Sequence, residues 1–152
     1  MGRTLKIYTS YFYQIRNFTP NLIPVSTALS DPAWYRPPQG EEYYIDKRGI
    51  VCGLRYEPLI VQSQGNHGCP CESPSNAPFC PTMIEYRQLL DKLVNKEKTL
   101  KAFEFCLNKF SADTIVLMVY ETPKNLCSER IALQNFFNCE ELRYPIGENY
   151  GN

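Results

Sequence analysis

The sequence predicts an α/β domain with a mostly parallel sheet flanked by helices, and three observations support this fold class. A β-branched and aromatic run, typical of a strand, occupies residues 5–9. Residues 115–120 are six residues without polar alternation, which is typical of a strand buried on both faces. Between these runs lie two stretches with apolar residues at helical spacing, one from Thr82 and one after Asn95. A strand, helices and a second, buried strand in this order indicate a parallel sheet with crossover connections.

The remaining elements are weaker. Residues 22–26 form a short apolar run in which Pro24 offers no N–H, so this strand is expected at a sheet edge. Prolines and glycine make residues 30–48 irregular, and residues 49–55 and 59–61 are predicted as short extended pieces. A final helix is expected over about 126–138.

Length and charge restrict the class of protein. The 152 residues correspond to one domain, and a hydrophobic fraction of 43% is enough for a core. Lys plus Arg and Asp plus Glu both number 16, and this balance argues against binding to nucleic acid through its phosphates. No apolar run reaches the roughly 20 residues that cross a bilayer. The first residues lack the apolar core of a signal peptide, so a cytoplasmic protein without membrane contact is predicted.

The seven cysteines leave two interpretations open. Their odd number and the missing export signal favour free or metal-bound thiols over a disulfide framework. His67, Cys69, Cys71 and Cys80 fall within fourteen residues, and four such ligands can hold a structural zinc ion. The alternative is a loop with free thiols, or with one disulfide formed on purification, because a Cys-x-Cys spacing is not the usual one of zinc fingers.

A candidate ligand site follows from the rule that open parallel sheets bind ligands beyond the carboxyl ends of their strands. Thr9, Ser10 and Tyr11 follow the first predicted strand, and Glu121 to Cys127 follow the buried one. The hydroxyls could hold a ligand and Glu121 could orient it or act as a base. Cys127 near a helix start could be a nucleophilic thiolate, or it could be a buried apolar residue. Arg55 could bind a phosphate or a carboxylate through its two-pronged head.

Aromatic residues are abundant in the first third of the chain. Trp34, Tyr35, Tyr43 and Tyr44 lie in the irregular stretch, where they could pack onto the domain surface or line a cleft. Tyrosines could also stack on a nucleobase. The sequence contains neither the phosphate loop Gly-x4-Gly-Lys-Ser/Thr nor a Gly-x-Gly-x-x-Gly motif, so neither NAD nor ATP is predicted as a cofactor.

Several segments, in the same order along the chain, resemble a YeaO-like family of bacterial and phage proteins of unknown function. They are residues 6–12, 22–26, 32–35, 53–55, 57–59, 86–93 and 115–121, with Cys127 and the helix after it. The resemblance implies one compact Rossmann-like domain over residues 1–152, in which the cysteine-rich segment at about 63–81 is an insertion. Family members often carry Cys-His-Arg at the start of the last helix, whereas this chain has Ser128 and Glu129 after Cys127.

The function predicted from these observations is binding of a small molecule, one that is nucleotide-like or phosphorylated. One alternative is a small enzyme that acts on a nucleotide-derived substrate with Cys127 and Glu121. Another is a phage or mobile-element protein that binds and blocks a host protein.

Overall fold

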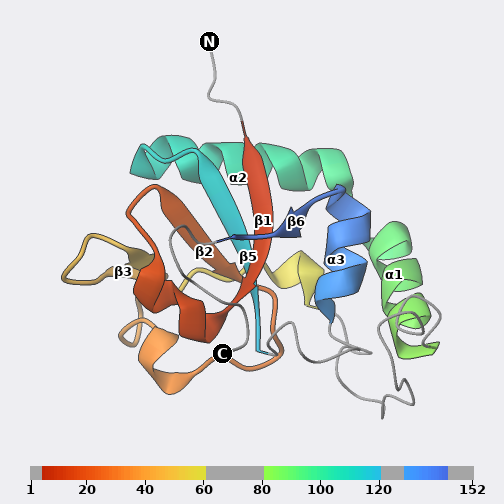
Figure 1. Ribbon diagram of the computed structural model, residues 1–152, viewed down its shortest axis with the longest axis horizontal. Coiled ribbons are helices and arrows are strands. Elements are labelled where there is room, and N and C mark those ends of the chain that lie inside the picture. The colour runs from red at the N-terminus through yellow and green to blue at the C-terminus, as the bar shows by residue number, and fades with distance from the viewer. Residues whose placement is uncertain (1–4, 61–80, 121–128, 144–152) are drawn as a thin grey trace.

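The fold is a four-stranded parallel sheet with a small hairpin beside it (Figure 1). The computed structural model describes residues 5–60, 81–120 and 129–143. The strand order in the sheet is β2-β5-β1-β6, and every neighbouring pair is parallel. The strands are β1 (Lys6–Tyr11), β2 (Leu22–Ser26), β5 (Thr114–Val119) and β6 (Glu140–Glu141), and the separate hairpin consists of β3 (Tyr44–Ile45) and β4 (Val51–Cys52). The predicted α/β class, with a parallel sheet flanked by helices, is confirmed.

The central strand is β5, and all six of its side chains are buried. Ile115, Leu117 and Val119 pack on one face of the sheet, against the helices, whereas Val116 and Met118 pack on the other. Burial on both faces explains why the sequence shows no polar alternation here.

The α-helices cover only one face of the sheet. They are α1 (Pro81–Leu93), α2 (Lys96–Phe110) and α3 (Glu129–Phe137). Their apolar residues, among them Leu90, Phe103 and Leu133, join the core cluster of that face. The helix predicted after Asn95 is confirmed as α2, and Asn95 caps it, because its Oδ1 accepts a hydrogen bond of 2.9 Å from the N–H of Lys98.

The opposite face of the sheet is covered by short elements. These are the β3–β4 hairpin and the 3₁₀ helices η1 (Phe12–Asn17) and η2 (Ala33–Tyr35), which bury Phe12, Ile15 and Tyr35 on Val116 and Met118. A third 3₁₀ helix, η3 (Glu57–Leu59), packs Leu59 into the core on the helical face. The predicted extended piece at 59–61 is therefore wrong at Leu59, because Pro58 favours a helical turn there.

The edge position predicted for residues 22–26 is confirmed. β2 lies at the end of the sheet, and its outer side forms a bridge between Ser26 and Arg55. Since Pro24 has no N–H, it fits a strand that needs few donors on that side.

None of the helices in the described ranges is long and apolar enough to cross a membrane.

Candidate functional site

The segments that the sequence places around a ligand do lie in neighbouring strands. β1 and β5 pair in parallel from Lys6 with Thr114 to Tyr11 with Val119. Their carboxyl ends therefore meet at one edge of the sheet, as predicted. However, β1 runs to Tyr11, two residues beyond the predicted strand, so Thr9, Ser10 and Tyr11 lie inside it rather than after it.

These three side chains are buried, each with 2% exposure or less. The Thr9 hydroxyl donates to Glu141 Oε1 and accepts a hydrogen bond from Gln134 Nε2, each at 2.8 Å. The Tyr11 hydroxyl accepts from Gln14 Nε2 at 2.6 Å. Neighbouring residues of a strand point to opposite faces, so Ser10 lies on the opposite face from Thr9. Thr9 and Ser10 are neighbours in the chain, but their hydroxyls lie on different faces of the sheet.

Arg55 lies at the carboxyl end of β2, where it contacts two carboxylates. Its Nη1 is 2.8 Å from Asp31 Oδ1, and its Nε is 3.2 Å from Glu57 Oε2. The same Asp31 oxygen accepts a hydrogen bond from the Ser26 hydroxyl, and the Asp31 side chain is only 4% exposed. Arg55 therefore holds a buried carboxylate of its own chain at the place where a ligand anion was expected.

The other predicted site residues lie outside the described residues. This applies to Glu121 and Cys127, and to the zinc set His67, Cys69, Cys71 and Cys80. Within the described ranges, no three His, Cys, Asp or Glu residues come together in a way that could hold a metal ion.

A buried polar network surrounds Thr9 of β1, and of its members only Thr9 was a candidate site residue in the sequence. Arg130 Nε lies 2.7 Å from Glu141 Oε1, the oxygen that Thr9 also contacts. Glu141 Oε2 is buried and has no hydrogen-bond partner among the described residues. Burial raises the pKa of this carboxyl, although Arg130 and the Thr9 hydroxyl act to lower it.

The raised pKa of Glu141 gives a testable pH dependence. The folded state favours the protonated carboxyl, so ionisation of Glu141 costs stability as the pH rises above the unfolded pKa of about 4.3 and through the folded pKa. Glu141→Gln stays neutral, and we expect it to gain stability relative to the wild type from pH 4 to pH 7, as measured by urea unfolding. Glu140→Gln, a neighbouring exposed position, is the control. A difference between E141Q and the wild type that stays constant with pH would contradict the assignment.

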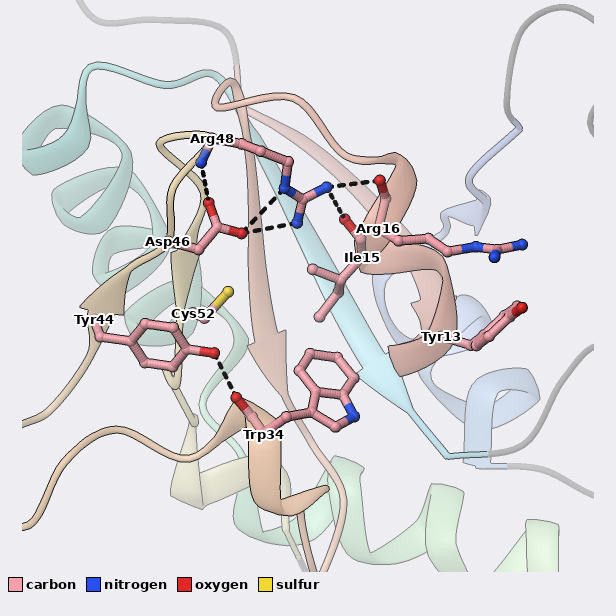
Figure 2. A pocket seen from close by; sticks show the side chains of 8 residues that line it. All are labelled: Tyr13, Ile15, Arg16, Trp34, Tyr44, Asp46, Arg48 and Cys52. Carbon is pink, nitrogen blue, oxygen red and sulfur yellow. Dashed lines mark hydrogen bonds and ion pairs between the residues drawn. The ribbon is translucent and has the colours of Figure 1, made fainter.

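An open pocket of about 360 Å³ lies on the face of the sheet opposite the α-helices, and we call it the aromatic pocket (Figure 2). Three segments far apart in the sequence form it: η1, η2 and the β3–β4 hairpin with its turn. The lining residues are Tyr13, Ile15, Arg16, Trp34, Tyr44, Asp46, Arg48 and Cys52.

The hairpin turn is held in place by Asp46 and Arg48. Asp46 Oδ1 accepts from the N–H groups of Arg48 and Ile50, at 2.8 and 3.0 Å, and Oδ2 lies 2.8 Å from Arg48 Nη2. Gly49, at φ +90°, supplies the left-handed backbone that this turn requires. Burial opposes ionisation of Asp46, but the hydrogen bonds from Arg48 and from the backbone outweigh it and lower the pKa.

Arg48 also connects the hairpin to η1. Its Nη1 donates to the carbonyl oxygens of Ile15 and Arg16, at 3.1 and 2.6 Å (Figure 2). These carbonyls lie near the end of a 3₁₀ helix, where the Ile15 carbonyl also accepts a hydrogen bond of 3.0 Å from the N–H of Phe18. The contact fixes the backbone from which the Arg16 side chain projects.

Two aromatic side chains of the pocket are open to solvent. Trp34 is 53% exposed and Tyr13 is 55% exposed. The Tyr44 hydroxyl donates to the Trp34 carbonyl oxygen, which ties the hairpin to η2. Burial and the neighbouring Cys52 raise the pKa of Tyr44 to about 12, and burial raises the pKa of the Cys52 thiol. Both shifts favour the protonated form of these groups at neutral pH.

Arg16 is the positive charge of the pocket that lacks a carboxylate partner within the described part of the chain. Its guanidinium carbon lies 4.1 Å above the centroid of the Tyr13 ring. Stacking uses the face of the guanidinium and leaves its N–H edge available for an in-plane acceptor. The stacked Arg16 and Tyr13 side chains, which project away from Trp34 in Figure 2, thus add one cationic edge at the rim of the pocket.

The sequence indicated part of this pocket. Trp34 and Tyr44 belong to the aromatic stretch for which cleft lining was one of two interpretations, and Tyr35 of the same stretch is instead fully buried. Arg16 and Arg48 were not predicted, because nothing local distinguishes them from solvated surface arginines.

No protein-family model, curated protein or solved structure matches the chain. The resemblance to the YeaO-like family therefore stays a prediction, and the function has to be inferred from the geometry of the pocket.

Proposed function

We propose that this chain is a small-molecule-binding protein, and that its ligand carries a flat ring and an anionic group, as nucleotide-like and phosphorylated ring compounds do. One observation carries the proposal: the guanidinium of Arg16, which has no carboxylate partner among the described residues, lies at a pocket with the exposed rings of Trp34 and Tyr13. Aromatic faces stack on planar ligands, and an arginine edge pairs with phosphate or carboxylate oxygens.

The charges of the pocket favour an anion. Asp46 is neutralised by Arg48 at 2.8 Å, which leaves the charge of Arg16 uncompensated among the described lining residues. The volume of about 360 Å³ lies at the lower end of the range for ligand pockets, roughly 300–1,000 Å³, and is suited to a compact ligand.

Isothermal titration calorimetry with AMP and with phenyl phosphate tests this function. We expect Trp34→Ala to weaken binding by about 5- to 150-fold through lost stacking. Arg16→Ala should weaken it by about 10- to 100-fold through lost charged hydrogen bonds. Phe105→Ala, an exposed aromatic residue on α2, and Arg87→Ala, an arginine on α1, are the matched controls and should leave both affinities unchanged.

Absence of binding of both compounds at millimolar concentration would refute the proposal. Binding that neither W34A nor R16A weakens, with both variants folded by circular dichroism, would place the ligand elsewhere and refute it equally.

A further inference from the structure

We infer that the aromatic pocket recognises nucleoside monophosphates by their single phosphate and by stacking on the ring, without selecting the base. This inference rests on the proposed function and specifies its ligand class. Two properties of the pocket carry it: the number of unpaired charges, and the hydrogen-bonding capacity that the polar side chains have left.

The charges limit the ligand to one phosphate. Three charged side chains are found among the described lining residues, namely Arg16, Asp46 and Arg48. Arg48 and Asp46 pair with each other through Nη2 and Oδ2, and the remaining charge is that of Arg16. One guanidinium can make a two-pronged contact with one phosphate. A second or third phosphate would find no further unpaired cation in the described lining, so it would add little to the binding free energy.

The polar side chains that hold the hairpin wall of the pocket in place already have hydrogen-bond partners. Asp46 accepts two hydrogen bonds at Oδ1 and two at Oδ2, which fills the usual capacity of a carboxylate. Arg48 donates from its Nε, Nη1 and Nη2 atoms to Asp46 and to the end of η1. The Tyr44 hydroxyl donates to the Trp34 carbonyl oxygen.

Base selection requires unsatisfied donors and acceptors at fixed positions. A site built to hydrogen-bond a substrate group rejects analogues without that group by roughly 10⁴-fold or more, whereas a site without such groups discriminates weakly. Stacking tolerates every base because each has a π-face. The exposed Trp34 ring supplies such a face, which projects from η2 toward η1 in Figure 2. Apart from Arg16, the remaining side-chain donors of the lining, the Trp34 indole N–H and the Tyr13 hydroxyl, lie on side chains that are 53% and 55% exposed, where water competes for them. The pocket therefore distinguishes ligands by the phosphate more than by the base.

Calorimetric titration of the full chain with a small panel tests the inference. The panel is AMP, GMP, CMP and UMP, with adenosine, ATP and a single-stranded tetranucleotide. We expect the four monophosphates to bind within about 10-fold of one another, since stacking energies differ modestly between bases. Adenosine should bind at least about 10-fold more weakly than AMP, because it lacks the phosphate that pairs with Arg16. ATP should bind at most about 3-fold more tightly than AMP, because only one charged contact is available among the described lining residues. Arg16→Ala should abolish the difference between AMP and adenosine, whereas Arg87→Ala should preserve it.

Three results would overturn the inference while leaving the proposed function intact. A preference of more than 100-fold for one base would show that the base edge is recognised. An affinity for ATP that is 10-fold or more higher than the affinity for AMP would reveal a further cationic contact. An affinity for the tetranucleotide that is 10-fold or more higher than the affinity for the monophosphates would indicate that the pocket binds a nucleic acid strand. Failure of the proposed function itself looks different, because AMP and phenyl phosphate would then both fail to bind or would bind independently of Trp34 and Arg16.

Discussion

Replacing Leu117 with alanine is expected to lower the free energy of unfolding by about 2–5 kcal/mol, the range for a fully buried leucine. Leu117 lies in the middle of β5 and has no exposed surface. It pairs with Thr9 on one side and with Val25 on the other, and it packs into the core under the helices. A strand held between two others has little freedom to move into the space left by the lost side chain, so a cavity remains.

Urea unfolding at neutral pH measures this loss, with Leu93→Ala as the control. Leu93 ends α1 and is 61% exposed, so the same substitution there should cost less than about 1 kcal/mol. The melting temperature of L117A should fall by about 2–4 °C for each kcal/mol lost. A loss below 1 kcal/mol in L117A, with an unchanged dependence on urea concentration, would mean that β5 is not the centre of the sheet.

Replacing Asp31 with asparagine is the second change for which we expect a large effect. The Asp31 carboxylate is 4% exposed, pairs with Arg55 at 2.8 Å and accepts the hydroxyl of Ser26. Removing one member of a fully buried ion pair costs roughly 3–5 kcal/mol. Because the Arg55 side chain is 27% exposed and keeps its contact with Glu57, we expect a smaller loss, about 2–3 kcal/mol.

Asp91→Asn is the matched control for this ion pair. Asp91 pairs with Arg87 at 3.3 Å on α1, but the two side chains are 56% and 36% exposed. Exposed pairs four residues apart on a helix contribute about 0.3–0.5 kcal/mol, so D91N should change the free energy of unfolding by at most about 0.5 kcal/mol. Equal losses in D31N and D91N, measured by urea unfolding at pH 7, would show that burial of Asp31 does not strengthen its interactions.

Much of the fold could be predicted because its signals are local. The unbroken apolar run at 115–120 predicted a strand buried on both faces, and Asn95 marked the start of α2. Pro24 indicated an edge strand, because proline has no N–H to donate to a neighbouring strand. The length of β1 was less predictable, since Ser10 and Tyr11 continue the strand although such residues are also common in turns.

The candidate site could be predicted only in part, because it depends on contacts between distant segments. Arg55 was identified as a cation at the strand ends, but its pairing with Asp31 results from the way residues 26–31 fold back at the end of β2. In the same way, Arg16 and Arg48 look alike in the sequence, yet Arg16 stacks on Tyr13 without a carboxylate partner among the described residues, whereas Arg48 connects two elements. No periodicity or spacing encodes such a difference.

The walls of the aromatic pocket belong to segments that join the sheet through side chains and loops, not through the ladder of the four parallel strands. A ligand that settles there would therefore order the periphery of the domain and leave the strands and the α-helices where they are. If the pocket binds the proposed ligand, substitution of its exposed side chains Trp34 and Tyr13 should alter binding with little effect on the buried core of the sheet.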